Sequence, residues 1–406
     1  MLRILMIASN IYPIPAVLGG SIESLIQYFL KENIKNNRVD LTLYSIDNPM
    51  ARKVHSELFK EANIIYINRT MIDKLWDRLW PVNRVFLKVF KKQFLANPYI
   101  KRVYKNLKNM DYDYIIFEGN YYEKCDYLYK KVGRKRLIIH WHGEIVGHRI
   151  LAEWFSKHIC ISNYVARVLT CNGYINANDA LVLKNCINLE LFSQTLTSVQ
   201  RIELLSNYNI SENDFVISFI GRIVPEKGVR ELLLAFKDVC SKNPNCKLLI
   251  IGSSAFGYEE KTAYETEMEK IAESMNAKIV FTGFVHHDEM WKLLKLSNVS
   301  VFPSIWNEGA GMVGLEIMAA SVPLITFNVG GISEYVDKDV CVMLDWDKNI
   351  VRKLSDSILS LTNNKEKLAE MSMKGYAYVQ KYSTSIYYNN YCDLLYAIDA
   401  ERNLEK

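Results

Sequence analysis

The chain has 406 residues, half of them hydrophobic, and a formal net charge of +5 at pH 7. This length exceeds one ordinary core and predicts two well-packed domains, while the small net charge does not argue for nucleic acid. No uninterrupted apolar stretch reaches the ~20 residues that span a bilayer. The eight cysteines lack C-x-x-C spacing and lie mostly in apolar runs, which indicates reduced, buried thiols in a cytosolic protein.

Short apolar runs separated by helical patterns fill the first half of the chain. Residues 4–8 predict a buried first strand rather than a signal peptide, because no cleavage region follows. Gly19 and Gly20 then form a loop whose backbone can approach a ligand closely, and a plain turn, which is compatible with that role, also explains them. Further strands are predicted at residues 41–45, 64–67, 114–117, 137–140, 158–161 and 181–183.

The segment between residues 71 and 110 carries many cations against only two acids, Asp73 and Asp77. Apolar residues recur there at helical spacing after Trp76 and Trp80, namely Val82, Val85, Phe86, Val89 and Phe90. Such a basic amphipathic stretch suits an anionic membrane surface. An ordinary helix with a core-facing stripe and solvated lysines fits the same pattern.

His140 and His142 end the strand at residues 137–140 and share one face of it. They could ligate a metal, but the sequence offers no third ligand at a suitable spacing. Two Asp-x-Asp patterns occur, Asp111-Tyr112-Asp113 before a strand and Asp345-Trp346-Asp347 in an expected surface loop. Neither position suits a metal site, so we predict no essential metal.

A polar stretch at residues 191–213 predicts a linker before a second series of strands. These are expected at residues 215–220, 247–251, 278–281, 299–302, 323–327 and 341–344. Alternating strands and helices predict two doubly wound α/β domains with parallel sheets, which bind ligands at the carboxyl ends of their strands. Apolar residues at helical spacing from Tyr387 to Ile398 predict a terminal helix with one buried face.

Two motifs follow strands of this second series. The first, Gly221 to Gly228, contains Arg222 and Lys227, whose charges suit phosphate oxygens, although surface cations are usually only solvated.

The second motif is a Gly-x-Gly turn that begins at Glu308 and leads into a predicted helix carrying Glu316. Backbone N–H groups at such a turn favour an anion, and the two carboxylates suit neutral sugar or ribose hydroxyls. A helix-capping acid and a solvated acid are the plainer alternative.

Together these motifs resemble the retaining, family-four glycosyltransferases of the GT-B fold, also described as glycosyl transferases group 1. The resemblance runs nearly the whole chain and includes Thr282-Gly283-Phe284, Gly19-Gly20-Ser21-Ile22-Glu23, His142-Gly143, Ser162-Asn163-Tyr164 and Asn185-Cys186-Ile187-Asn188. It implies two Rossmann-like domains facing across a cleft. Residues 1–190 would bind the acceptor, 191–213 would link, 214–385 would bind the nucleotide-sugar donor, and a helix at 386–406 would cross back to the N-terminal domain.

The resemblance also implies residue roles. Arg222 and Lys227 would neutralise the donor diphosphate, Glu308 would hold the transferred sugar, Glu316 the ribose, and His142 would lie against the reacting sugar. The implied catalytic residues are His142, Arg222, Lys227 and Glu308. The implied donor-binding residues are Gly19, Gly20, Gly221, Gly283, Phe284, Val285, Gly309, Ala310, Gly311, Met312 and Glu316. Ala310 departs from the bulky residue often found at its position, which alters the shape of the sugar pocket.

The implied function is a retaining hexosyltransferase that needs no metal or other cofactor. It would move a sugar from a UDP- or GDP-sugar to a glycan or lipid-linked acceptor in bacterial surface polysaccharide or glycoconjugate synthesis. A sugar phosphorylase, a nucleotide-sugar epimerase of related fold and a non-catalytic partner that binds a nucleotide or glycan remain alternatives. We expect a cytoplasmic protein, peripheral on the inner face of the membrane if residues 76–108 contact lipid.

Overall fold

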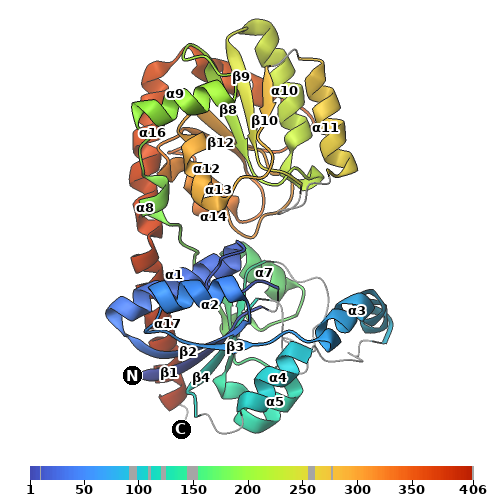
Figure 1. The fold of residues 1–406 in the computed structure, drawn as a ribbon, viewed down its shortest axis with the longest axis vertical. Helices are drawn as coiled ribbons and strands as arrows, with labels where there is room; N and C mark the ends of the chain where they lie inside the picture. Colours follow the sequence, from blue (N-terminus) through green and yellow to red (C-terminus); the bar gives the residue numbers. More distant parts are fainter. Residues whose placement is uncertain are drawn as a thin grey trace. The chain divides into compact units, whose positions relative to one another are not determined.

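The computed structural model describes residues 1–9, 11–90, 98–107, 111–119, 125–143, 154–254, 261–275 and 278–404. The chain forms two compact units (Figure 1). Unit 1 consists of Met1–Cys186 and Thr384–Lys406, and unit 2 consists of Ile187–Ser383.

Unit 1 is built on a seven-stranded sheet in the order β3-β2-β1-β4-β5-β6-β7, and all its strands pair in parallel. The chain crosses from β1 to β2 on one side and later returns to place β4 on the other, so the order reverses between β1 and β4. The strands are β1 Leu2–Ile7, β2 Val39–Ile46, β3 Asn63–Ile67, β4 Tyr114–Glu118, β5 Leu137–Trp141, β6 Lys157–Cys160 and β7 Ala180–Val182. The residues of these strands are buried and largely apolar, so helices must shield the sheet from water.

The C-terminal helix α17 (Thr384–Leu404) belongs to unit 1 and lies beside α1 (Ser21–Asn36) (Figure 1). Phe29 of α1 contacts both Tyr388 and Tyr391 of α17, with ring centroids 5.0 Å apart in each pair. The predicted return of the terminal helix to the N-terminal unit is therefore confirmed. The other helices among the described residues of unit 1 are α2 Pro49–Leu58, α3 Met71–Phe90, α4 Pro98–Asn106, α5 Cys125–Val132, η2 Arg134–Arg136, α7 Asn163–Cys171 and η3 Ala177–Asp179.

Unit 2 is built on a six-stranded parallel sheet in the order β10-β9-β8-β11-β12-β13, which reverses between β8 and β11. The strands are β8 Phe215–Ile220, β9 Cys246–Ile251, β10 Ile279–Phe281, β11 Val299–Phe302, β12 Leu324–Phe327 and β13 Val342–Leu344. Residues of β8 alternate between two cores, with Val216 and Ile220 in one and Ile217 and Phe219 in the other. This is the doubly wound α/β class that the sequence predicts.

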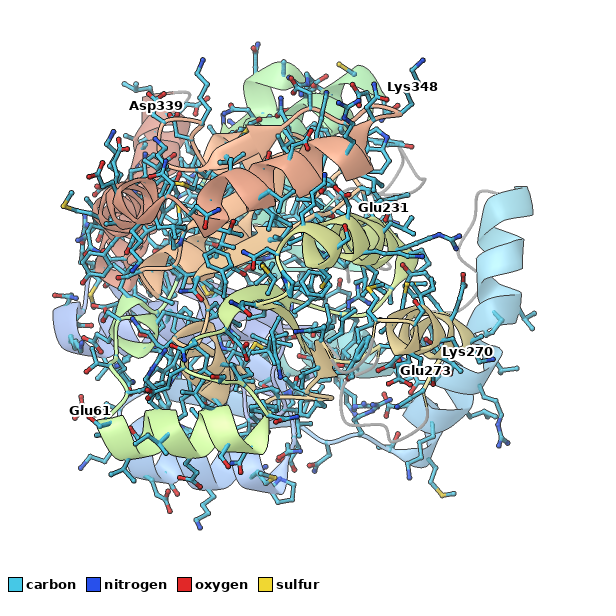
Figure 2. The ribbon with its side chains drawn as sticks, turned by 90° about the horizontal axis from the view of Figure 1, so that it is seen from above. Glu61, Glu231, Lys270, Glu273, Asp339 and Lys348 are labelled. Atoms are coloured by element: carbon cyan, nitrogen blue, oxygen red, sulfur yellow. The ribbon has the colours of Figure 1, made fainter. Side chains whose placement is uncertain are left out.

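Helices cover both faces of the unit 2 sheet. Met268 and Ala272 of α11 pack inward, while Lys270 and Glu273 point outward (Figure 2). The helices are α8 Leu189–Phe192, α9 Ser198–Asn207, η4 Pro225–Lys227, α10 Val229–Lys242, α11 Ala263–Glu273, α12 His287–Leu294, α13 Met312–Ala319, α14 Ile332–Tyr335, α15 Ile350–Thr362, α16 Lys365–Val379 and η5 Gln380–Tyr382. None of the described helices combines the length and apolar character needed to cross a membrane.

Residues 191–213, predicted as a linker from their polar composition, belong to unit 2 and carry α9. Thr197 and Gln200 form a capping box that starts this helix. Leu205 and Ile210 are buried in the unit 2 core. Local capping and a few apolar residues thus anchor a segment whose composition resembles that of a linker.

Candidate active site

The two motifs of unit 2 follow the strands that flank its switch point. Gly221 to Gly228 follows β8, and the Glu308 turn follows β11. In open α/β sheets, ligands bind at the carboxyl ends of the strands where the order reverses. Gly221, Gly252 and Gly283 lie just past the ends of β8, β9 and β10, and Gly252 bridges Gly283. Bare backbone therefore lines this edge of the sheet.

Lys227 and Glu308 contact each other directly. The Lys227 ammonium lies 2.5 Å from Glu308 Oε1, and Ser304 Oγ donates to the same oxygen at 2.6 Å. Gly228 permits this contact, because it adopts a left-handed conformation and a Cβ there would lie 1.9 Å from the carbonyl oxygen of Pro303. The structure therefore brings two predicted site residues together, although they are 81 residues apart.

The Glu308 turn leads into α13 through Gly309, Ala310 and Gly311. Gly311 is the N-cap of α13 and supplies no side-chain cap, and the helix starts at Met312. The first N–H groups of a helix lack intrahelical partners, so this end suits an anion. Ala310 and Met312 pack partly against the unit 2 core.

Glu316 lies in the second turn of α13 and pairs with His287, the first residue of α12. His287 Nε2 lies 2.9 Å from Glu316 Oε1. Burial works against the charged imidazole, but the charge and hydrogen bond of Glu316 outweigh it and raise the pKa of His287. Sequence reasoning missed His287, although it stands four residues after Gly283.

The remaining unit 2 residues differ in exposure. Phe284 is 44% exposed and its ring contacts that of His286, whereas Val285 packs partly against the core. Arg222 is exposed and makes no ion pair within the described part of the chain. Its charge is therefore available to a ligand.

The glycine loop of unit 1 lies between β1 and α1, beside the switch point of that sheet. Gly20 is the N-cap of α1 at φ 103°, and a Cβ there would lie 2.2 Å from Glu23 Oε2. Glu23 is buried and accepts a hydrogen bond from Ser9 Oγ at 2.7 Å, while burial raises its pKa. The loop that carries Gly19 and Gly20 is thus tied to the end of β1 through Glu23.

Glu118, at the end of β4, gathers three hydrogen bonds inside unit 1. His140 Nδ1 and His142 Nε2 each lie 2.9 Å from Glu118 Oε2, and the Tyr391 hydroxyl donates to Oε1 at 2.7 Å. Burial alone would raise the pKa of Glu118, but the two imidazoles hold it well below its usual range. Burial, together with His140, lowers the pKa of His142 to about 4 despite the contact with Glu118.

Glu118 also supplies the third ligand that the sequence did not reveal. Glu118, His140 and His142 are the one set of three His, Cys, Asp or Glu residues, among those described, whose ligand atoms lie within 4.8 Å of one another. The prediction from sequence spacing that His140 and His142 have no suitable third ligand is therefore wrong. β4 and β5 are neighbours in the sheet, so residues 22 positions apart meet.

The two Asp-x-Asp patterns are engaged in surface ion pairs. Asp111 pairs with Arg3 and Arg136, and Asp347 pairs with Lys353.

We expect acid to destabilise unit 1 between about pH 6.5 and pH 4. Burial lowers the pKa of His142 and of His158 to about 4, while an unfolded His titrates near ~6.5. In this window the unfolded state binds more protons, so stability falls as pH falls. Glu118, whose pKa is also lowered, adds a loss at still lower pH. Hydrogen exchange of β5 and β6 in urea checks this, and stability that stays constant from pH 7 to pH 4.5 contradicts it.

Comparison with known proteins identifies the fold of the chain and the family of residues 200–378. Residues 200–378 match the family described as Glycosyl transferases group 1. This segment is a group 1 glycosyltransferase domain. YtcC of Bacillus subtilis strain 168 is 25% identical over 357 residues, which cover 84% of this chain and 78% of YtcC.

Two further proteins extend the comparison. The capsular polysaccharide biosynthesis glycosyltransferase CapM of Staphylococcus aureus is 30% identical over 181 residues, or 44% of this chain and 45% of CapM. The Anabaena protein Alr3699/HepE, solved in complex with UDP-glucose, superposes with a TM-score of 0.71 at 15% identity and covers 98% of this chain and 100% of its own. The chain has the GT-B fold of such glycosyltransferases.

Proposed function

We propose that this glycosyltransferase transfers a hexose, with retention, from a nucleoside diphosphate sugar to a glycan or lipid-linked acceptor. The observation that carries the proposal is the Lys227–Glu308 pair at the switch point of unit 2, next to the uncapped start of α13. The pair sets a cation for phosphate beside a carboxylate for sugar hydroxyls. The UDP-glucose complex of HepE and the name of CapM support a nucleotide-sugar donor and a polysaccharide product.

The chemistry follows from these charges. As the bond between the anomeric carbon and the diphosphate oxygen breaks, the leaving diphosphate takes the electron pair. Arg222, Lys227 and the N–H groups of α13 would stabilise that charge, so we propose that no metal is required. The acceptor hydroxyl forms the new bond on the same face, and its proton passes to the departing phosphate oxygen. Glu308 holds a sugar hydroxyl while Lys227 turns toward the phosphate.

Release of nucleoside diphosphate tests the proposal. The purified protein is incubated with UDP- and GDP-sugars and an acceptor extract, with and without a chelator, and the product linkage is determined. A transferase releases nucleoside diphosphate and forms an α-linked product from an α-linked donor. Phosphate-dependent release of sugar from a glycan favours the phosphorylase instead, and binding without turnover favours a non-catalytic partner.

We also propose that α3 docks on an anionic membrane surface on the cytoplasmic side. Along one face of α3, five apolar side chains are exposed: Met71 85%, Ile72 65%, Leu75 57%, Leu79 42% and Val82 56%. Asp73 and Trp76, on the opposite face, are buried, and Asp73 pairs with Arg102 of α4. Lys74 and Arg78 are exposed beside the apolar face. An apolar face edged by cations is complementary to an anionic bilayer.

This face differs from the stripe predicted from the sequence. Val82 is the one member of that stripe whose side chain lies within the described residues, and it is exposed. The side chains of residues 83–90, all of residues 91–97 and Lys108 lie outside them. The outward-facing stripe instead starts at Met71, ahead of the predicted one.

Changing Leu75 and Leu79 together to Glu is expected to abolish sedimentation with phosphatidylglycerol-containing vesicles. Each buried apolar side chain contributes about 1.5–3 kcal/mol, and each nearby cation on the order of 1 kcal/mol. The matched control is Val199→Glu with Ile202→Glu, which alters two exposed apolar residues of α9. If both double variants bind vesicles like the unaltered protein, α3 is not the docking surface.

A further inference from the structure

The Glu118 cluster, defined as Glu118, His140, His142 and Tyr391, is a buried polar network that the proposed chemistry does not yet use. Its side chains come from β4, β5, the residue after β5, and α17. The side chains of Glu118, His140 and His142 are at most 7% exposed, and Tyr391 is 1% exposed. Burying a polar group is unfavourable unless it is hydrogen-bonded, so the hydrogen bonds of this network determine which of its atoms carry protons.

The hydrogen bonds determine where the protons lie. An ionised carboxylate only accepts, so His140 Nδ1 and His142 Nε2 must each carry a proton that is donated to Glu118 Oε2. The opposite ring atoms, His140 Nε2 and His142 Nδ1, are buried and have no hydrogen-bond partner among the described residues. A proton there would place an unpaired donor on a buried cationic ring. His142 is therefore neutral, with one defined tautomer.

We propose that Glu118 and Tyr391 are positioning residues that hold His142 as a neutral imidazole, with Nε2–H donated to Glu118 and Nδ1 kept as an acceptor for a ligand hydroxyl. The nature of that ligand, a hydroxyl of the sugar or of the acceptor glycan, rests on the proposed function. The geometry of the network does not. A phosphate or carboxylate oxygen would find no donor at Nδ1, so His142 selects for the hydroxyl-bearing part of the substrate.

The same atoms also form a His₂Glu set that could attract a metal. Tetrahedral Zn²⁺ with bonds of ~2.0–2.1 Å separates its ligand atoms by roughly 3.3 Å. Here both nitrogens lie 2.9 Å from one carboxylate oxygen, an ordinary length for N–H···O, and Tyr391 occupies the other oxygen. The spacing therefore favours a hydrogen-bonded network, and a bound metal is an outcome that the test must detect.

Tyr391 makes the terminal helix part of this network, and Tyr388 provides a matched control for it. Both tyrosines are buried on α17 and contact Phe29 at the same centroid distance of 5.0 Å. The Tyr388 hydroxyl, however, donates to Asn33 Oδ1 at 2.7 Å rather than to Glu118. Tyr391→Phe and Tyr388→Phe thus each remove one buried hydroxyl from the same helix, but only the first removes a donor to Glu118.

The first measurement is nitrogen-15 NMR of the histidine side chains, with His142 assigned through a His142→Asn variant. Between about pH 6 and pH 8, His142 is expected to be neutral and protonated at Nε2. Glu118→Gln, which replaces an acceptor oxygen by an NH₂ donor, should shift or mix this tautomer. A His142 that is protonated at Nδ1, or cationic at pH 7, overturns the proposal, as does a stoichiometric Zn²⁺ or Mn²⁺ that shifts the His142 signals.

The second measurement is transfer kinetics of the paired tyrosine variants. Tyr391→Phe should lower kcat about 10-fold and Glu118→Gln at least about 10²-fold. The reason is that a His142 imidazole in the wrong tautomer or orientation loses its hydrogen bond to the ligand hydroxyl. Tyr388→Phe should stay within about twofold, and no variant should change nucleoside diphosphate affinity, since Arg222, Lys227 and Glu316, the side chains proposed to bind the nucleotide, lie in unit 2. Equal losses in the two tyrosine variants would show only weaker docking of α17 and overturn the proposal. If no nucleotide sugar is turned over, the proposed function fails, and the tautomer measurement still decides the positioning role.

Discussion

Replacing Lys227 by Ala is expected to lower turnover by at least about 10²-fold, the usual cost of losing one preorganised group that stabilises developing charge. Lys227 is half-buried, lies against Glu308 and is 5.8 Å from the centre of the Phe302 ring, so its charge is held at the end of β11. The leaving diphosphate gains charge as the glycosidic bond breaks. The loss should therefore appear mainly in kcat, with a smaller loss of nucleotide affinity.

Arg222→Ala should cause a comparable loss, because the exposed Arg222 guanidinium makes no ion pair within the described chain and can bind phosphate oxygens in a bidentate manner. Lys353→Ala is the control, since Lys353 pairs with Asp347 at 2.7 Å on the surface of the same unit. Exposed pairs contribute little, so its turnover should stay within about twofold of the unaltered protein. Turnover near normal in both Lys227→Ala and Arg222→Ala contradicts the assignment of unit 2 to the donor diphosphate.

The strands and the motifs that follow them could be predicted from the sequence because they are local. Apolar runs gave β1, β8 and β11, and glycines marked the turns at Gly20 and Gly228. Once the sheets are parallel and doubly wound, strand ends gather at one edge, so the meeting of Lys227 with Glu308 follows from topology.

The residues that sequence reasoning missed depend on pairings that no local pattern encodes. Glu118 reaches His142 because β4 and β5 are neighbours, and Tyr391 reaches Glu118 across 273 residues of chain. For α3 the sequence left open whether its apolar stripe faces outward or the core. A helical stripe shows that one side is apolar, but whether protein covers that side is decided by packing. The same holds for Leu205, whose burial turns a polar segment into part of unit 2.

Of the two variants Glu308→Gln and Glu316→Gln, only Glu316→Gln is expected to weaken nucleoside diphosphate binding. Glu316 is expected on the ribose, where a charged acceptor is worth about 1.5–3 kcal/mol, so Glu316→Gln should weaken binding of UDP or GDP by roughly 10-fold or more. Glu316→Gln also removes the carboxylate that raises the pKa of His287. Calorimetry with the nucleotide alone at pH 7.5 measures this loss.

Glu308→Gln should leave nucleotide affinity unchanged or increase it, while turnover falls by about 10²-fold or more. Glu308 pairs with Lys227 in the structure, so removing the charge of Glu308 leaves the full positive charge of Lys227 for the diphosphate. The sugar, however, loses the carboxylate that orients its hydroxyls, so the reacting carbon is no longer positioned for attack. Glu289→Gln is the control, since Glu289 is exposed and pairs only with Lys292 among the described residues. Equal weakening of nucleotide binding by Glu308→Gln and Glu316→Gln would refute the division between sugar and ribose, because Glu308 would then act on the nucleotide itself.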